Sequence, residues 1–210
     1  MRPVEALTRH ASSWGWLVTV SAFALLTAGL AMVVWWAATN EERTGTYNVR
    51  GSVSGITLDI GEADLQIVGG GNQAALLGSC SSSYRLRVPD NVPVRVRTTS
   101  GNVSSSGYRG SATVDTRSGD VNFDGWCGFN LLIRADVGDV RAVAACAPQR
   151  LQLRSRQGSV EALVPPGRYR VDAESDEGKR SVRGVTTGDD APFQVQALST
   201  TGDVRVGSGP

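Results

Sequence analysis

Residues 118–121 read Ser118-Gly119-Asp120-Val121, and close variants of this stretch recur along the second half of the chain. The glycines of five such stretches are separated by 18, 19, 20 and 44 residues, and Gly178 divides the last interval into steps of 20 and 24. The five glycines are Gly101, Gly119, Gly138, Gly158 and Gly202. A repeat of about 20 residues is typical of proteins built from stacked coils.

Each repeat contains two stretches that favour β-strands. Polar and apolar residues alternate after the glycine, as in Asp120-Val121-Asn122-Phe123, and a second apolar stretch such as Leu131-Leu132-Ile133 follows. Two short strands and two turns use up a repeat of about 19 residues and leave no room for a helix. The predicted fold class is therefore all-β, a single-stranded parallel β-solenoid (β-helix) with coils of about 19 residues that stack in chain order.

This stacking predicts buried columns of equivalent residues. Val121 and Val140 follow successive repeat glycines, so they should lie about 4.8 Å apart on neighbouring coils. The first strands, in residues 47–67, and the last, residues 203–206, should lie near the two ends of the stack. Exposed strand edges there would favour end-to-end association.

Two of the three cysteines fit the same register. Cys127 and Cys146 each lie eight residues after a repeat glycine, so stacking should place one above the other. A spacing of about 4.8 Å suits a disulfide, and an exported domain meets an oxidising compartment. The pair is predicted to form a disulfide; the alternative is two small buried apolar side chains. Cys80 has no partner in this scheme.

The chain begins with an uncharged apolar segment. Residues 14–38 form a stretch that, as a helix, would rise about 37 Å, enough to cross a hydrocarbon core of about 30 Å. Tryptophans lie near both of its ends, and Arg2 and Arg9 precede it, which favours a cytoplasmic amino terminus. We expect a cytoplasmic tail (1–13), a transmembrane helix (14–38), a linker (39–46) and an exported β-solenoid domain (47–207). A cleaved secretory signal is the alternative.

The composition after the apolar segment excludes several classes of function. Removing Arg2, Arg9 and Glu5 from totals of 21 basic and 20 acidic residues leaves 19 of each, so no charge imbalance favours nucleic acid. The single histidine is His10, before the segment, so the exported part holds no histidine for a triad or zinc site. We expect no enzymatic activity, no cofactor and no resident metal.

Asp120 and Asp139 hold the same position after their glycines, so stacking should bring their carboxylates together. Two further interpretations remain open for them. With Arg141 they could cleave a polysaccharide, or they could bind calcium. The simpler interpretation is a column of solvated turn residues.

Four arginines flank the turn between Pro89 and Pro93. Arg85 and Arg87 precede it, and Arg95 and Arg97 follow it. Because they alternate with apolar residues, they could gather in one patch that binds an anionic cell-wall polymer or lipid phosphate. A solvated outer face with nearby carboxylates is the alternative.

Two further segments carry a resemblance to a known family. A proline turn precedes an alternating strand at residues 88–97 and again at 164–171, and the chain closes with Ser199-Thr200-Thr201-Gly202-Asp203-Val204-Arg205-Val206. Together with the glycine repeats, residues 47–207 resemble the bacterial putative-adhesin beta-strand-repeat family, a domain of unknown function. The resemblance implies a β-solenoid and no particular catalytic residue. Some members are membrane-anchored and linked to cell-envelope stress responses.

The sequence thus predicts a single-pass protein of the cell membrane with an extracellular β-solenoid that acts as a non-catalytic binding, adhesion or scaffold module. Its expected partners are the membrane, through residues 14–38, and a cell-wall polymer or another envelope protein. One alternative is a regulatory partner in cell-envelope stress sensing. A carbohydrate-active β-helix enzyme is another.

Overall fold

A computed structural model describes residues 45–48, 54–79 and 83–209. The predicted cytoplasmic tail, transmembrane helix and most of the linker lie outside these residues, as does Cys80. Within the described part of the chain, no helix is long and apolar enough to span a membrane.

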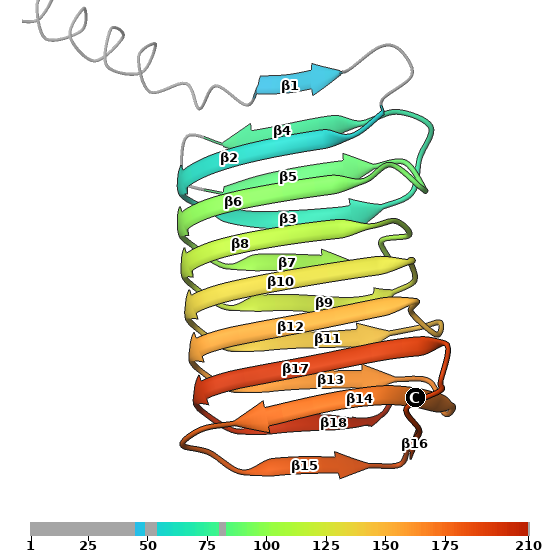
Figure 1. The fold of residues 1–210 in the computed structure, drawn as a ribbon. Helices are drawn as coiled ribbons and strands as arrows, with labels where there is room; N and C mark the ends of the chain where they lie inside the picture. The colour runs from blue at the N-terminus through green and yellow to red at the C-terminus, as the bar shows by residue number, and fades with distance from the viewer. Residues whose placement is uncertain (1–44, 49–53, 80–82, 210) are drawn as a thin grey trace, which may run out of the picture. The chain divides into compact units, whose positions relative to one another are not determined.

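Two β-sheets face each other across a common core (Figure 1). The eight-stranded sheet has the spatial order β16 (Thr186–Thr187), β14 (Arg168–Ser175), β17 (Phe193–Thr201), β12 (Arg150–Gln157), β10 (Asn130–Val137), β8 (Ala112–Ser118), β6 (Val94–Ser100) and β2 (Ile56–Glu62). The ten-stranded sheet has the order β1 (Gly45–Asn48), β4 (Ala75–Ser79), β5 (Ser83–Val88), β3 (Asp64–Gly69), β7 (Val103–Ser106), β9 (Val121–Trp126), β11 (Val140–Ala144), β13 (Val160–Val164), β18 (Val204–Ser208) and β15 (Arg180–Arg183).

The chain alternates between the two sheets, one strand in each per coil, and neighbouring coils pair in parallel. Val103 pairs with Val121, Val121 with Val140, and Val140 with Val160, so the predicted valine column is present and buried. The all-β class and the parallel stacking of coils are confirmed.

The stacking order at the carboxyl-terminal end differs from the prediction. β17 lies between β12 and β14, and β18 lies between β13 and β15, as Figure 1 shows for the red strands. The last coil in sequence is therefore inserted inside the stack, and β15 and β16 are the outermost strands there. Residues 203–206 lie near this end, as predicted, but one strand in from it, so the exposed edge expected for them belongs to β15. Residues 184–191, between β15 and β17, provide the extra length that brings the chain back past β14.

The amino-terminal end also departs from simple winding. After β3 the chain forms β4 and β5, which pair with each other in antiparallel fashion, and β5 then pairs in parallel with the outer edge of β3. β6 returns to the eight-stranded sheet beside β2. Antiparallel pairing of β1 with β4 completes this end of the ten-stranded sheet. At this end β1 is the outermost strand of the ten-stranded sheet and β2 is the outermost strand of the eight-stranded sheet.

The core is a set of apolar ladders that also holds four aromatic side chains. Trp126, Phe123, Tyr108 and Tyr169 are completely buried. The Trp126 indole nitrogen donates to the Gly110 carbonyl at 2.8 Å. The single proton of the Tyr108 hydroxyl lies between the carbonyl oxygens of Val92 and Ser111, which are 2.5 and 3.0 Å from the hydroxyl oxygen. Burial raises the pKa of the Tyr108 hydroxyl, so this group stays a hydrogen-bond donor.

Cys127 and Cys146 lie at the turns that follow β9 and β11. Their Cα atoms are 5.1 Å apart, and a disulfide joins them. The disulfide joins two adjacent coils at the edge opposite the turns that contain the repeat glycines.

Candidate functional site

The turns that contain the repeat glycines, here called the glycine corners, are joined by a ladder of hydrogen bonds. The side chains in this ladder belong to the residues at the corners, among them Asp120 and Asp139, which we call the acidic column. The backbone N–H of Asp139 donates to Asp120 Oδ1 at 2.8 Å, and the N–H of Ser159 donates to Asp139 Oδ1 at 2.7 Å. In the same way, the N–H of Asp120 donates to Asn102 Oδ1 at 2.9 Å, and the N–H of Asn102 donates to Asp64 Oδ1 at 2.7 Å. Each side chain therefore caps a backbone donor of the next coil that no strand would satisfy.

Buried hydroxyls satisfy the corners from inside. Ser155 donates to the Gly138 carbonyl at 2.8 Å, and Ser199 donates to the Gly158 carbonyl at 2.7 Å. These two serines are nearly inaccessible, yet their hydroxyl groups are paired, which explains their place among the apolar inner residues of β12 and β17.

This geometry assigns Asp120 and Asp139 a structural role. One oxygen of each carboxylate accepts a backbone hydrogen bond, and Arg141 donates instead to Glu161 Oε2 at 2.8 Å on the outer face of the ten-stranded sheet. The three residues considered for polysaccharide cleavage thus have separate partners. In residues 45–48, 54–79 and 83–209, no three acidic, histidine or cysteine side chains group as a metal site would require.

Replacing Asp139 tests this assignment. Asp139→Asn keeps an oxygen that accepts the Ser159 N–H, as Asn102 does in its own coil, so stability should be almost unchanged. Asp139→Ala removes the acceptor and should lower the free energy of unfolding by about 1 kcal/mol. Urea titration of both variants measures the difference. Equal destabilisation by the two changes, or a large shift on adding calcium to the wild type alone, would favour a cation site.

The predicted arginine patch divides into two halves on opposite faces. β5 belongs to the ten-stranded sheet, so exposed Arg85 and Arg87 project from its outer side. β6 belongs to the eight-stranded sheet, so Arg95 and Arg97 project from the other outer side. The prediction of one patch is wrong, because the proline turn between the two strands carries the chain from one sheet to the other.

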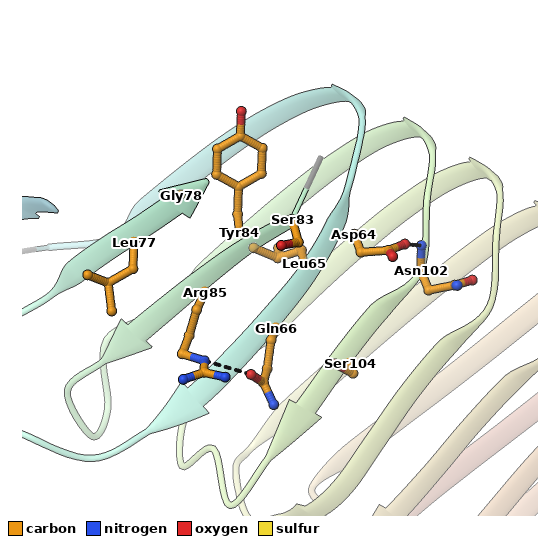
Figure 2. Close-up of a pocket in the computed structure, with 10 residues that line it drawn as sticks. All are labelled: Asp64, Leu65, Gln66, Leu77, Gly78, Ser83, Tyr84, Arg85, Asn102 and Ser104. Atoms are coloured by element: carbon orange, nitrogen blue, oxygen red, sulfur yellow. Dashed lines mark hydrogen bonds between the residues drawn. The ribbon is translucent and has the colours of Figure 1, made fainter. Parts of the chain in front are cut away.

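The half with Arg85 borders a hollow of about 400 Å³ on the ten-stranded sheet (Figure 2). Arg85 Nε donates to Gln66 Oε1 at 2.7 Å, and the two side chains point toward each other while Tyr84 points to the opposite side. Leu77, beside them, is partly exposed. Arg85 already donates to the Gln66 amide, and its neighbour Leu77 is apolar. Together they make a weak site for an anion.

The half with Arg95 belongs to a larger basic surface. A groove of about 500 Å³ crosses the first residues of β2, β6, β8, β10 and β12, and its polar lining includes Arg95, Thr113, Asn130, Arg150 and Gln152. We call the outer side of β6, β8, β10 and β12 the arginine face. Its arginines are Arg95, Arg97, Arg117, Arg134, Arg150, Arg154 and Arg156.

Sequence reasoning found Arg95 and Arg97 but missed the other five. The signal was present in β12, where Arg150, Arg154 and Arg156 alternate with buried Leu151, Leu153 and Ser155. Their grouping with Arg97 depends on which strands share a sheet, and that becomes visible once each coil is divided between the two sheets.

The chain is similar to a known protein family and to a solved structure. A family model described as Toastrack DUF4097 matches residues 79–207. A crystal structure of a putative cell adhesion protein from Clostridium sporogenes ATCC 15579 is similar over its whole chain and 80% of this one, with 9% identity and a TM-score of 0.38. No curated protein matches the sequence.

Proposed function

The chain belongs to the Toastrack DUF4097 family, and from that premise we propose that it is a non-catalytic binding or scaffold module that a single membrane anchor displays on the outside of a bacterial cell. Family membership, first indicated by the resemblance of the repeats, fits a module of this kind. The anchor is the apolar segment 14–38, and its flanking charges favour an outward-facing carboxyl-terminal domain.

The proposal that the module is non-catalytic rests on the hydrogen bonds of the acidic column. Asp120 and Asp139, the candidates for acid-base chemistry, hold successive coils together through their carboxylate oxygens. What the solenoid offers to other molecules is its two broad outer faces, where polar side chains stand in rows about 4.8 Å apart. Such faces suit extended contact with a partner better than enclosure of a small substrate.

Lys179 provides a direct test of the outward orientation. It is the only lysine of the chain and is exposed, and the other primary amine is the amino terminus, which the proposal places in the cytoplasm. Treating intact cells with a membrane-impermeant amine reagent should modify Lys179 and leave the amino terminus unmodified, as read by peptide mass spectrometry.

The matched control is Lys179→Arg, which keeps the charge and should lose the label. Label on the amino terminus but not on Lys179, or label on Lys179 that appears only after cell lysis, would refute the proposed orientation.

A further inference from the structure

The two outer sides of the same four coils differ sharply in charge. The arginine face carries seven arginines and two carboxylates, Asp115 and Asp136. The opposite side, formed by β7, β9, β11 and β13, carries Arg141 with two carboxylates, Asp124 and Glu161. Since the exported part of the chain has equal numbers of acidic and basic residues, positive charge is concentrated on one face.

Most of these arginines are available to a ligand. Arg134 pairs with Asp115 at 3.7 Å, and Arg156 pairs with Asp136 at 3.3 Å. The other five make no ion pair within the described part of the chain, and all of them are exposed; they are Arg95, Arg97, Arg117, Arg150 and Arg154.

The register places one pair of like charges side by side. Arg134 pairs with Arg154 on the neighbouring strand, and Asp115 separates Arg134 from Arg97 in the same row. Like charges directly opposite each other on adjacent strands destabilise a sheet, and a bound anion between them offsets the repulsion. Guanidinium groups bind the paired oxygens of phosphate in a forked geometry.

The remaining groups on this face indicate the kind of polyanion. Hydroxyl and amide side chains line the groove beside Arg95 and Arg150, and they suit a ligand whose backbone carries hydroxyl groups. The apolar side chain at the outward positions of the four strands is Leu132, which is half-buried. Surfaces that lie in a bilayer insert exposed apolar side chains. Near this face, in the described part of the chain, the large exposed apolar side chains are Val137, the last residue of β10, and Phe129, just before β10, and the seven arginines outnumber them.

From this combination we propose that the arginine face binds an extended polyol phosphate polymer, which runs across the strands and places successive phosphodiesters against arginines of neighbouring coils. The inference rests on the proposed function, because the polymer is met only on the outside of the cell. It replaces the four-arginine patch expected from the sequence with a surface on one sheet.

The test uses the full chain in nanodiscs of zwitterionic lipid, with poly(glycerol phosphate) as the probe. Changing Arg97, Arg150 and Arg154 to Gln should weaken binding about tenfold, from the loss of three exposed ion pairs. Changing Arg85, Arg87 and Arg183 to Gln removes the same charge from the ten-stranded sheet and should alter the dissociation constant less than twofold. The first triple changed to Lys should restore most of the binding, which separates loss of charge from misfolding.

Further arms distinguish the sources of negative charge. Binding of poly(glycerol phosphate) should exceed binding of poly(galacturonate) and of empty nanodiscs with anionic lipid, and it should weaken as salt is added. No binding by the wild type, equal loss in both glutamine triples, or preference for the polyuronate or the lipid would overturn the inference. If Lys179 is labelled on intact cells but the protein does not bind the polymer, this inference alone is rejected. If Lys179 is not labelled on intact cells, the proposed function itself is rejected.

Discussion

Gly119→Val should destabilise the domain by about 3 kcal/mol or more. Gly119 has a φ of +126°, a conformation that residues with a side chain rarely adopt. A Cβ atom there would lie 2.2 Å from the carbonyl oxygen of Gly101 and 2.7 Å from its carbon, because each corner packs directly on the backbone of the neighbouring corner. The backbone itself would have to move, and it carries the hydrogen bonds that join the two coils. Chemical denaturation followed by circular dichroism measures the loss.

Gly61→Val provides the matched control. Gly61 lies in β2, and a Cβ atom there would meet nothing within 4 Å. This change should leave the free energy of unfolding within about 0.5 kcal/mol of the wild type. A Gly119→Val protein as stable as the Gly61→Val protein would show that the corners do not pack backbone on backbone.

Trp126→Ala should lower the free energy of unfolding by about 3–5 kcal/mol. Trp126 is the largest completely buried side chain, and its loss would leave a cavity between the sheets and an unpaired Gly110 carbonyl. The same denaturation experiment measures the change.

Phe129→Ala provides a second aromatic truncation three residues away. Phe129 is 68% exposed, so its removal should change stability by no more than about 0.5 kcal/mol. A similar loss for the two truncations would contradict the position of Trp126 in the core.

The glycine repeat was sufficient to predict the coil, because each coil has the same glycine turn followed by the same buried strand position. Gly101, Gly119 and Gly138 stack, the valines that follow them are buried, and Cys127 lies beside Cys146. Local periodicity determines which residues face inward and which equivalent atoms meet on neighbouring coils. These features were therefore readable from spacing alone.

The order of the coils was not readable in this way. Every coil presents nearly the same backbone edge. The strands of residues 150–164 can therefore pair with the strands of residues 168–183 or with those of residues 193–208. The structure places the latter there, and Arg180 stands opposite Val204 at the outermost position. The 24-residue step from Gly178 to Gly202 was the available signal, since a chain that passes back over one coil needs extra length.

The arginine patch failed for a different reason. Alternation correctly placed Arg85, Arg87, Arg95 and Arg97 on outward positions, but two strands on either side of a turn belong to opposite sheets. Outward then means opposite directions for the two pairs. Residues that share a face are those related by the repeat, such as Arg134 and Arg154, and this rule locates the arginine face.

The proposed function gives the two outer faces different roles. In that proposal the basic side binds a polyanion, and the nearly neutral side is left for a protein partner. Since the acidic corners are occupied by structural hydrogen bonds, changes on the arginine face should alter binding without altering the stacking of coils.

Cysteine cross-linking tests the stacking most directly. In a Cys80→Ser background, Gln152→Cys with Gln196→Cys should form a disulfide on mild oxidation, because these residues pair on β12 and β17 and their side chains meet at 3.3 Å. Gln152→Cys with Asp172→Cys should not, since β17 lies between those strands. Mass spectrometry of non-reduced peptides distinguishes the two outcomes. A bridge between positions 152 and 172, with none between 152 and 196, would show that the coils stack in chain order and would contradict the structure described here.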